Sequence, residues 1–266
     1  MKDRIILTEY SLPAGLPERL TLGLVTDLHE HEPKKVLDLL GKCKPDLIMA
    51  AGDTFERYGK GEELRKKEEY GLLEWLFHSA CLRLDDFLEL LSDRSDADRG
   101  YAYRFFREAG KIAPVFLSLG NHEWYLLPED SRVIKETGTK LLDNGDCTVA
   151  IKGVNLCIGG LSTVPDLEWL EEYSRKEGYK ILLCHHPEFY ERYLNKKAVD
   201  LVLSGHAHGG QIRILNRGIY SPGQGLLPKY TKGVYEGKLV VSAGCSNTAS
   251  VPRLGNPCEV VAVHLE

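Results

Sequence analysis

Short runs of aliphatic and β-branched residues recur along the chain, and turn-forming residues bound each run. Runs of this length and composition indicate strands that are buried on both faces. Five of them lie at residues 20–26, 46–51, 115–119, 180–184 and 201–204. Apolar residues at helical spacing lie between some of these runs, at 33–43 and 166–176. The alternation of strand and helix predicts an α/β fold built on a mostly parallel sheet.

The pattern changes after Gly209. Residues 211–215, 237–243 and 259–265 are predicted strands, and glycine and proline turns separate them. Strands joined by short connections favour antiparallel pairing. We therefore expect a second, more antiparallel sheet packed on the first.

One long segment, residues 55–107, departs from this alternation. It is polar, rich in Glu, Lys, Arg and Leu, and has apolar residues at helical spacing. We expect two or three helices here, as a helical insertion after the second predicted strand. The insertion is either a cap or lid over the site described below, a helical pack on the sheet, or a dimer surface. Trp75, Phe77 and Phe87 either line an apolar groove or pack between helices, and the pattern favours packing.

The size and charge of the chain narrow its class. With 266 residues, of which 43% are hydrophobic, the chain can bury one large core, and we predict a single domain over residues 1–266. The formal net charge of −5 argues against a generally basic surface that follows phosphates, so nucleic acid is not the expected partner. The oligomeric state stays open.

The cysteines and the N-terminus bear on the compartment. The seven cysteines form no C-x-x-C pair, and most of them lie in or beside apolar runs. This usage predicts reduced, buried thiols in a reducing compartment. Residues 1–20 contain no apolar stretch long enough for a signal peptide or a spanning helix. We therefore expect a cytoplasmic protein without a membrane span.

A polar cluster follows each of the five predicted buried strands. The carboxyl ends of parallel strands border the crevice in which open α/β sheets bind ligands, so the five clusters can converge. The last cluster has two imidazoles one residue apart, preceded and followed by glycine, and such a pair is better explained as ligands than as part of a packed core. The clusters are Asp27-Leu28-His29, Gly52-Asp53, Gly120-Asn121-His122-Glu123, His185-His186-Pro187 and Gly205-His206-Ala207-His208.

This residue set suits a centre of two metal ions. Hydrolysis of a phosphate ester needs a nucleophile at neutral pH and charge neutralisation, and two divalent cations roughly 3.5–4 Å apart supply both through an acidified bridging water. A carboxylate can bridge such a pair, and Asp53, which follows a strand and precedes a turn, fits that role. Mixed nitrogen and oxygen ligands favour Mn, Fe, Zn or Co over Ca or Mg.

Together the five clusters resemble the calcineurin-like metallophosphoesterase superfamily, and the resemblance covers nearly the whole chain from Leu20 onward. Segments 209–212, 222–225 and 228–230 look like those of a bacterial branch. That branch includes membrane-associated phosphoesterases and some UDP-2,3-diacylglucosamine hydrolases. The resemblance implies a four-layer α/β/β/α sandwich of two mixed β-sheets flanked by helices.

The resemblance also implies a role for each matching residue. One metal ion would be held by Asp27, His29 and His208, and the second by Asn121, His185 and His206, with Asp53 bridging the two. His122 would face the leaving group and protonate it, and Glu123 would orient or stabilise the His122 imidazole. His186 is a neighbour that either supports a ligand from outside or is simply packed, and packing is favoured.

We therefore expect a phosphoesterase that hydrolyses a phosphomonoester or phosphodiester of a soluble small molecule, with a metal-bridging hydroxide as nucleophile. Two alternatives stay open. The first is a pyrophosphate hydrolase of a nucleotide-sugar lipid, which would need an exposed apolar groove within residues 55–107. The second is a non-catalytic protein-binding scaffold of the same fold, which would be expected to lose ligands that this chain retains.

Overall fold

The computed structural model describes residues 4–57, 98–214, 217–221, 224–247 and 253–266. Most of the predicted helical insertion, residues 58–97, lies outside the described residues, and so do Trp75, Phe77 and Phe87. The lid, packing and dimer interpretations of that segment therefore stay predictions. Within the described ranges, no helix is both long and apolar enough to cross a membrane.

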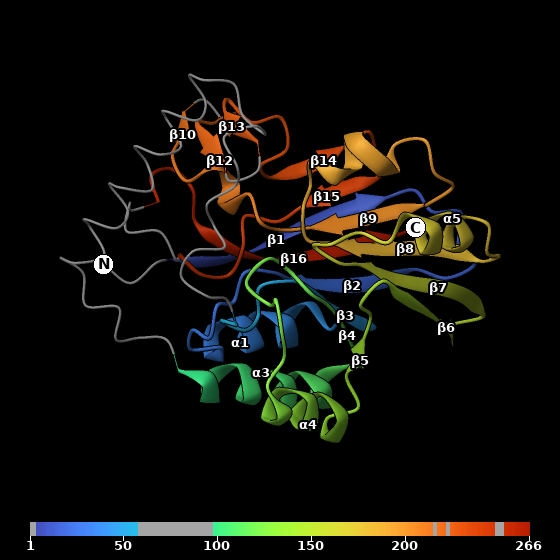
Figure 1. Cartoon of the computed structure of the whole chain (residues 1–266), viewed down its shortest axis with the longest axis horizontal. Coiled ribbons are helices and arrows are strands. Elements are labelled where there is room, and N and C mark those ends of the chain that lie inside the picture. Colours follow the sequence, from blue (N-terminus) through green and yellow to red (C-terminus); the bar gives the residue numbers. More distant parts are fainter. Residues whose placement is uncertain (1–3, 58–97, 215–216, 222–223, 248–252) are drawn as a thin grey trace.

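Two mixed six-stranded sheets form the centre of the molecule (Figure 1). The first has the order β1-β16-β2-β3-β4-β5. Its strands are parallel except at the antiparallel pair of β16 and β2. The strands are β1 (Ile5–Leu12), β16 (Cys258–Leu265), β2 (Leu20–Val25), β3 (Leu47–Ala51), β4 (Val115–Ser118) and β5 (Lys140–Leu141).

The second sheet has the order β14-β15-β9-β8-β7-β6. Its inner strands are parallel and both edge strands are antiparallel to their neighbours. The strands are β14 (Gly233–Tyr235), β15 (Leu239–Val241), β9 (Leu201–Ser204), β8 (Tyr179–Cys184), β7 (Val154–Leu161) and β6 (Gly145–Ile151). Two small hairpins precede β14, formed by β10 (Arg213–Ile214) with β11 (Arg217–Gly218) and by β12 (Tyr220–Ser221) with β13 (Gly225–Leu226).

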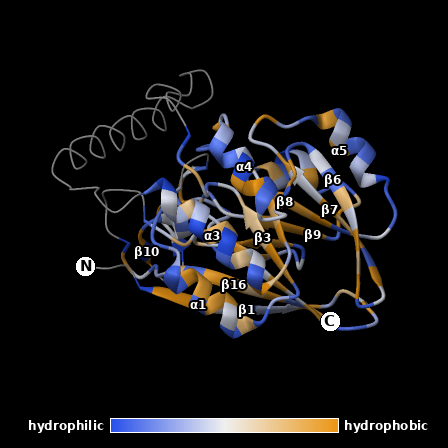
Figure 2. Cartoon of the chain, turned by 90° about the horizontal axis from the view of Figure 1, so that it is seen from below, coloured by the Kyte–Doolittle hydropathy of each residue, from blue (hydrophilic) through white to orange (hydrophobic). Residues whose placement is uncertain are grey.

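Helices cover the outer face of each sheet. On the first sheet lie α1 (Lys34–Cys43), α3 (Arg99–Ile112) and α4 (Pro128–Glu136), whose buried residues share one apolar cluster with that sheet. On the second lie α5 (Leu167–Ser174) and a π-helical turn, Tyr190–Leu194. Figure 2 shows mostly apolar strands and helices that carry both polar and apolar residues. The predicted four-layer α/β/β/α sandwich is confirmed.

The core lies between the two sheets, where alternate residues of the central strands meet. Leu22 and Met49 from the first sheet join Ile181 and Leu203 from the second in one fully buried cluster. Residues of the other parity, such as Ile48, face the helices. Central strands are thus buried on both faces, which explains their uninterrupted apolar runs.

The division of strands between the sheets differs from the prediction. Strands β8 and β9 belong to the second sheet, although the sequence pattern grouped them with β2, β3 and β4. Strand β16, expected in the second sheet, lies in the first between β1 and β2. The local pattern of residues predicts that a segment is a strand, but the partners of a strand depend on long crossover connections that the pattern does not reveal. With the observed pairing, both sheets contain parallel and antiparallel neighbours.

Candidate metal centre

The five polar clusters follow β2, β3, β4, β8 and β9, and they meet at the carboxyl ends of these strands. Asp27 stands two residues after β2, Asp53 two residues after β3 and His206 two residues after β9. His185 directly follows β8. Since β2, β3 and β4 run parallel in the first sheet, and β8 and β9 run parallel in the second, each sheet brings its clusters to one edge. The expected convergence of the clusters is therefore present in the structure.

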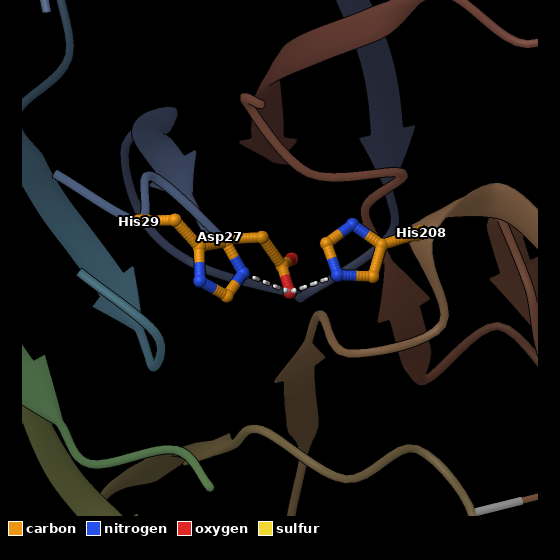
Figure 3. A group of neighbouring side chains, drawn as sticks. All are labelled: Asp27, His29 and His208. Carbon is orange, nitrogen blue, oxygen red and sulfur yellow. Dashed lines mark ion pairs between the residues drawn. The ribbon is translucent and has the colours of Figure 1, made fainter. Parts of the chain in front are cut away.

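Two ligand groups form where the clusters meet. In the first, Oδ1 of Asp27 lies 3.6 Å from Nε2 of His208 and 4.0 Å from Nε2 of His29 (Figure 3). In the second, Oδ2 of Asp53 lies 3.0 Å from Nε2 of His185, and His206 completes the group. Atoms that share one metal ion at about 2.0–2.2 Å are about 3–4 Å apart. Both groups therefore have the spacing of ligand sets.

Asp53 connects the two groups. Its Oδ2 atom is 3.8 Å from Nε2 of His29 in the first group and 3.0 Å from Nε2 of His185 in the second. Its Oδ1 atom accepts the backbone N–H of His122 at 2.9 Å, which fixes the carboxylate. Burial favours the neutral acid, yet His185 and His122 outweigh it and hold the pKa of Asp53 well below its usual range.

Several buried polar atoms at the centre form no hydrogen bond with any described residue. An unsatisfied buried polar atom costs about 1–3 kcal/mol, and more when charged. A cation bound among the atoms would satisfy them together, so these residues fit a metal ion. The atoms are Oδ2 of Asp27, Nε2 of His29, Oδ1 of Asn121 and Nε2 of His185.

The backbone at the strand ends is strained. Asp27, His29, Asp53, His206 and His208 all have positive φ, between 45° and 63°. Residues other than glycine adopt this region rarely and at a cost of about 1–3 kcal/mol each. The strained residues all lie within four positions of a strand end, and such clusters of strained residues are typical of functional sites.

Glycines allow the loops to approach closely. A Cβ atom on Gly52 would lie 2.4 Å from Nδ1 of His185, and one on Gly120 would lie 2.1 Å from Oδ1 of Asp53. Neither position accepts a side chain while the ligands keep their places. Gly120 thereby lets the loop after β4 approach the Asp53 carboxylate.

Partners outside the centre orient two of the imidazoles. Nδ1 of His185 donates to the carbonyl oxygen of Ala51 at 2.8 Å, and Nδ1 of His29 contacts the Glu56 carboxylate. A hydrogen on Nδ1 leaves Nε2 with a free lone pair, which is the state that binds metal. His208 differs, because the Arg253 guanidinium donates to its Nδ1 at 2.9 Å.

His122 lies at the rim of the centre, with 15% of its side chain exposed. Its Nε2 atom is 3.9 Å from Oδ2 of Asp53, and its Nδ1 atom is 3.0 Å from Oε2 of Glu56. Burial disfavours the Glu56 carboxylate, but His29 and His122 outweigh this and lower the pKa of Glu56 to about 2. An ionised Glu56 therefore stabilises positive charge on the His122 ring.

Glu123 occupies a different position from the one expected. Its two carboxylate oxygens accept backbone N–H groups of Asp53 at 3.0 Å, Thr54 at 2.8 Å, Phe55 at 2.9 Å and Gly120 at 2.7 Å. These bonds tie the loop after β3 to the loop after β4. The carboxylate that reaches the His122 ring belongs to Glu56 instead, and Glu123 acts on the backbone around Asp53.

Sequence reasoning missed two residues of the centre, Glu56 and Arg253. Glu56 stands three residues after Asp53 and was counted with the helical insertion. Arg253 comes from the segment before β16 and also donates to the carbonyl oxygen of Ala243. Cys184 has no role in the centre: burial raises the pKa of its thiol, and its Sγ atom donates to the carbonyl oxygen of His186.

Comparisons with known proteins agree with this geometry. The family model described as "Calcineurin-like phosphoesterase" matches residues 20–210. An uncharacterised metallophosphoesterase of Aquifex aeolicus (strain VF5) is 32% identical, over 99% of this chain and 91% of that protein. The uncharacterised protein YpbG of Bacillus subtilis (strain 168) is 28% identical, over 57% of this chain and 58% of its own length.

Solved structures show more distant likenesses. The calcineurin-like phosphoesterase YfkN from Bacillus subtilis has a TM-score of 0.45 and 13% identity, covering 85% of this chain and 81% of that chain. A structure described as a novel archaeal phosphodiesterase has a TM-score of 0.41 and 12% identity, covering 85% of each chain. These two likenesses are too distant to say anything about activity. The family model, however, matches well over half of the sequence, and the chain belongs to the calcineurin-like phosphoesterase family.

Proposed function

We propose that this protein is a phosphoesterase that depends on two metal ions and hydrolyses a phosphomonoester or phosphodiester. The observation that carries the proposal is the pair of buried ligand groups joined by Asp53, whose Oδ2 atom lies 3.8 Å from His29 and 3.0 Å from His185. Two ions bound there would supply an activated water and neutralise the phosphoryl oxygens.

The chain's own residues divide into two sets around Asp53. Asp27, His29 and His208 would hold one ion, and Asn121, His185 and His206 the other. The nitrogen and oxygen donors suit Mn, Fe, Zn or Co. The backbone N–H of His122 donates a hydrogen bond to Oδ1 of Asp53, so Oδ2 of Asp53 is left to face both sets.

His122 would handle the proton of the leaving group. Its ring is partly exposed at the rim, where a substrate can reach it, and Nε2 points toward the bridging carboxylate. Glu56 holds the ring by its Nδ1 atom and, as a carboxylate, favours the protonated imidazole that a general acid requires. Glu123 supports the same centre by holding the loops on which Asp53 and Asn121 lie.

The substrate is proposed as a soluble small-molecule phosphoester. A nucleotide-sugar lipid substrate would need an apolar groove within residues 55–107, and residues 58–97 of this segment lie outside the described part of the chain. The bacterial branch with UDP-2,3-diacylglucosamine hydrolases and the cytoplasmic location likewise stay predictions.

The test is turnover of metal-stripped protein reloaded with Mn, Fe, Zn or Co, on paired chromogenic phosphomonoester and phosphodiester substrates. Asp53→Asn should abolish turnover, and Asp38→Asn, an exposed carboxylate on α1 that pairs with Lys34, should leave it unchanged. Full turnover in Asp53→Asn would refute the dinuclear proposal. Silence with every metal, despite two bound ions per chain, would favour the non-catalytic scaffold.

A further inference from the structure

A second polar cluster lies beside the metal centre and takes no part in the function proposed above, except that it shares His206. It consists of His186, Glu188 and His206, whose potential ligand atoms all lie within 4.8 Å of one another. Glu188 stands in the turn after β8, and its side chain is only 10% exposed. His186 is almost fully buried, and its ring centroid lies 4.4 Å from that of His206.

The cluster is unsatisfied in a specific way. Both carboxylate oxygens of Glu188, Nδ1 of His186 and Nε2 of His206 are buried and form no hydrogen bond with any residue in the described ranges. A buried carboxylate without hydrogen bonds costs several kcal/mol unless a cation compensates its charge. The three side chains thus surround a place where positive charge is required.

The spacing of the cluster matches that of two ligands of one metal ion. Nδ1 of His186 and Oε1 of Glu188 are 3.3 Å apart, which is an ion-pair distance. Two tetrahedral ligands at about 2.0–2.1 Å from zinc are about 3.3–3.4 Å from each other. The observed separation therefore equals the edge of a zinc coordination tetrahedron.

Thr163 adds the outer support that a ligating imidazole needs. Its Oγ1 atom lies 3.2 Å from Nε2 of His186. When Nε2–H donates to this hydroxyl, Nδ1 carries the lone pair that faces Glu188. The ring of Phe189 packs against His186 with centroids 4.8 Å apart, which keeps this side of the cluster apolar. Outer partners and an apolar wall are typical of metal-binding histidines.

We propose that His186, Glu188 and Nε2 of His206 form a third cation site of the zinc class next to the dinuclear centre. His206 would serve the dinuclear centre through its other ring nitrogen, and would bind both ions as an imidazolate. The two imidazoles and the carboxylate are a donor set found in zinc proteins, and the set contains no thiolate. His186, for which the sequence favoured simple packing over outer support of a ligand, is then a ligand in its own right. The site needs neither Asp27 nor Asp53.

The stoichiometry of bound zinc tests the proposal. Metal-stripped full-length protein is loaded with Zn²⁺, desalted, and measured by elemental analysis and native mass spectrometry. We expect three ions per wild-type chain, two in Glu188→Gln, and three in the matched control Glu191→Gln, whose carboxylate lies at the surface beside Lys229. Two ions in the wild type, or three in Glu188→Gln, would overturn the third site.

Two further measurements keep the test decisive. If Glu188→Gln does not fold, Thr163→Val should weaken the third equivalent of zinc about 10–100-fold, as loss of outer partners does elsewhere. Unchanged affinity in that variant would count against the proposed ligand geometry. A third outcome separates this site from the proposed function. If the wild type binds one ion, and this ion is lost in Glu188→Gln but kept in Asp53→Asn, the result would support the site and refute the dinuclear function.

Discussion

The Glu56→Gln substitution tests how the proposed acid works. It replaces a carboxylate that contacts the rings of both His29 and His122 by a neutral amide of the same shape. We expect it to lower kcat while the fold persists, because Glu56 acts through the charge on His122.

The structure sets the size of the effect. Oε2 of Glu56 lies 3.0 Å from Nδ1 of His122, and a hydrogen bond to a charged group contributes about 1.5–3 kcal/mol. At about 1.4 kcal/mol per factor of ten, kcat should fall about 10–100-fold. His122→Ala removes the acid itself and should cost about 10²–10⁴-fold.

The assay compares substrates whose leaving groups differ in basicity. It is run at saturating metal concentration, because Glu56 also contacts His29 and its loss could weaken metal binding. A basic alkoxide needs its proton, whereas p-nitrophenolate leaves without one. The loss in Glu56→Gln should therefore be large for alkyl esters and small for p-nitrophenyl esters. Glu32→Gln is the matched control, because Glu32 pairs with Arg104 at the surface.

Two results would refute this reasoning. The first is a Glu56→Gln enzyme with the kcat of the wild type on alkyl esters. The second is a Glu56→Gln/His122→Ala double variant whose fold decrease in kcat equals the product of the decreases in the two single variants. If Glu56 acts through His122, the effects of the two substitutions do not multiply.

Three further predictions concern Gly120, Arg57 and the pH dependence of stability. Gly120→Ala should abolish binding of both ions of the dinuclear centre, because its Cβ atom would lie 2.1 Å from Oδ1 of Asp53. Elemental analysis would measure the bound ions, and circular dichroism should change little. If the variant keeps both ions, the close approach of Gly120 to Asp53 is contradicted. Arg57→Ala should lower the free energy of unfolding, measured in urea, by about 3–5 kcal/mol, because it leaves Glu30 and Asp130 buried without their guanidinium partner. A change below about 1 kcal/mol would show that these carboxylates find other partners. For metal-free protein, the lowered pKa of Glu56, about 2 against an ordinary 4.5, contributes about 3 kcal/mol of stability above pH 4.5, and this contribution is lost as the pH falls toward 2. The difference in unfolding free energy between wild type and Glu56→Gln should thus shrink by about half between pH 7 and pH 3, and a difference that does not change with pH would contradict it.

Much of the centre follows from the sequence alone. Predominantly apolar runs identified β2, β3, β4, β8 and β9, because strands buried on both faces carry few polar residues. Each run ends in residues that can ligate a metal, and strand ends in α/β folds border the ligand crevice. The types of residue at the centre, and the edge of the sheets on which they lie, were therefore predictable. The family follows from the same clusters, and the family model confirms it.

Only the tertiary structure decided how these pieces pair. It placed β8 and β9 in the second sheet and β16 in the first, because pairing depends on crossovers and not on the pattern within a strand. It also assigned the carboxylates: Glu123 turns to the backbone N–H groups of a loop some 70 positions away, and Glu56 reaches His122. Adjacent residues in a turn can point in opposite directions, so neighbourhood in sequence does not establish contact. The unsatisfied cluster of His186 and Glu188 became visible for the same reason, since burial and missing partners exist only in the folded chain.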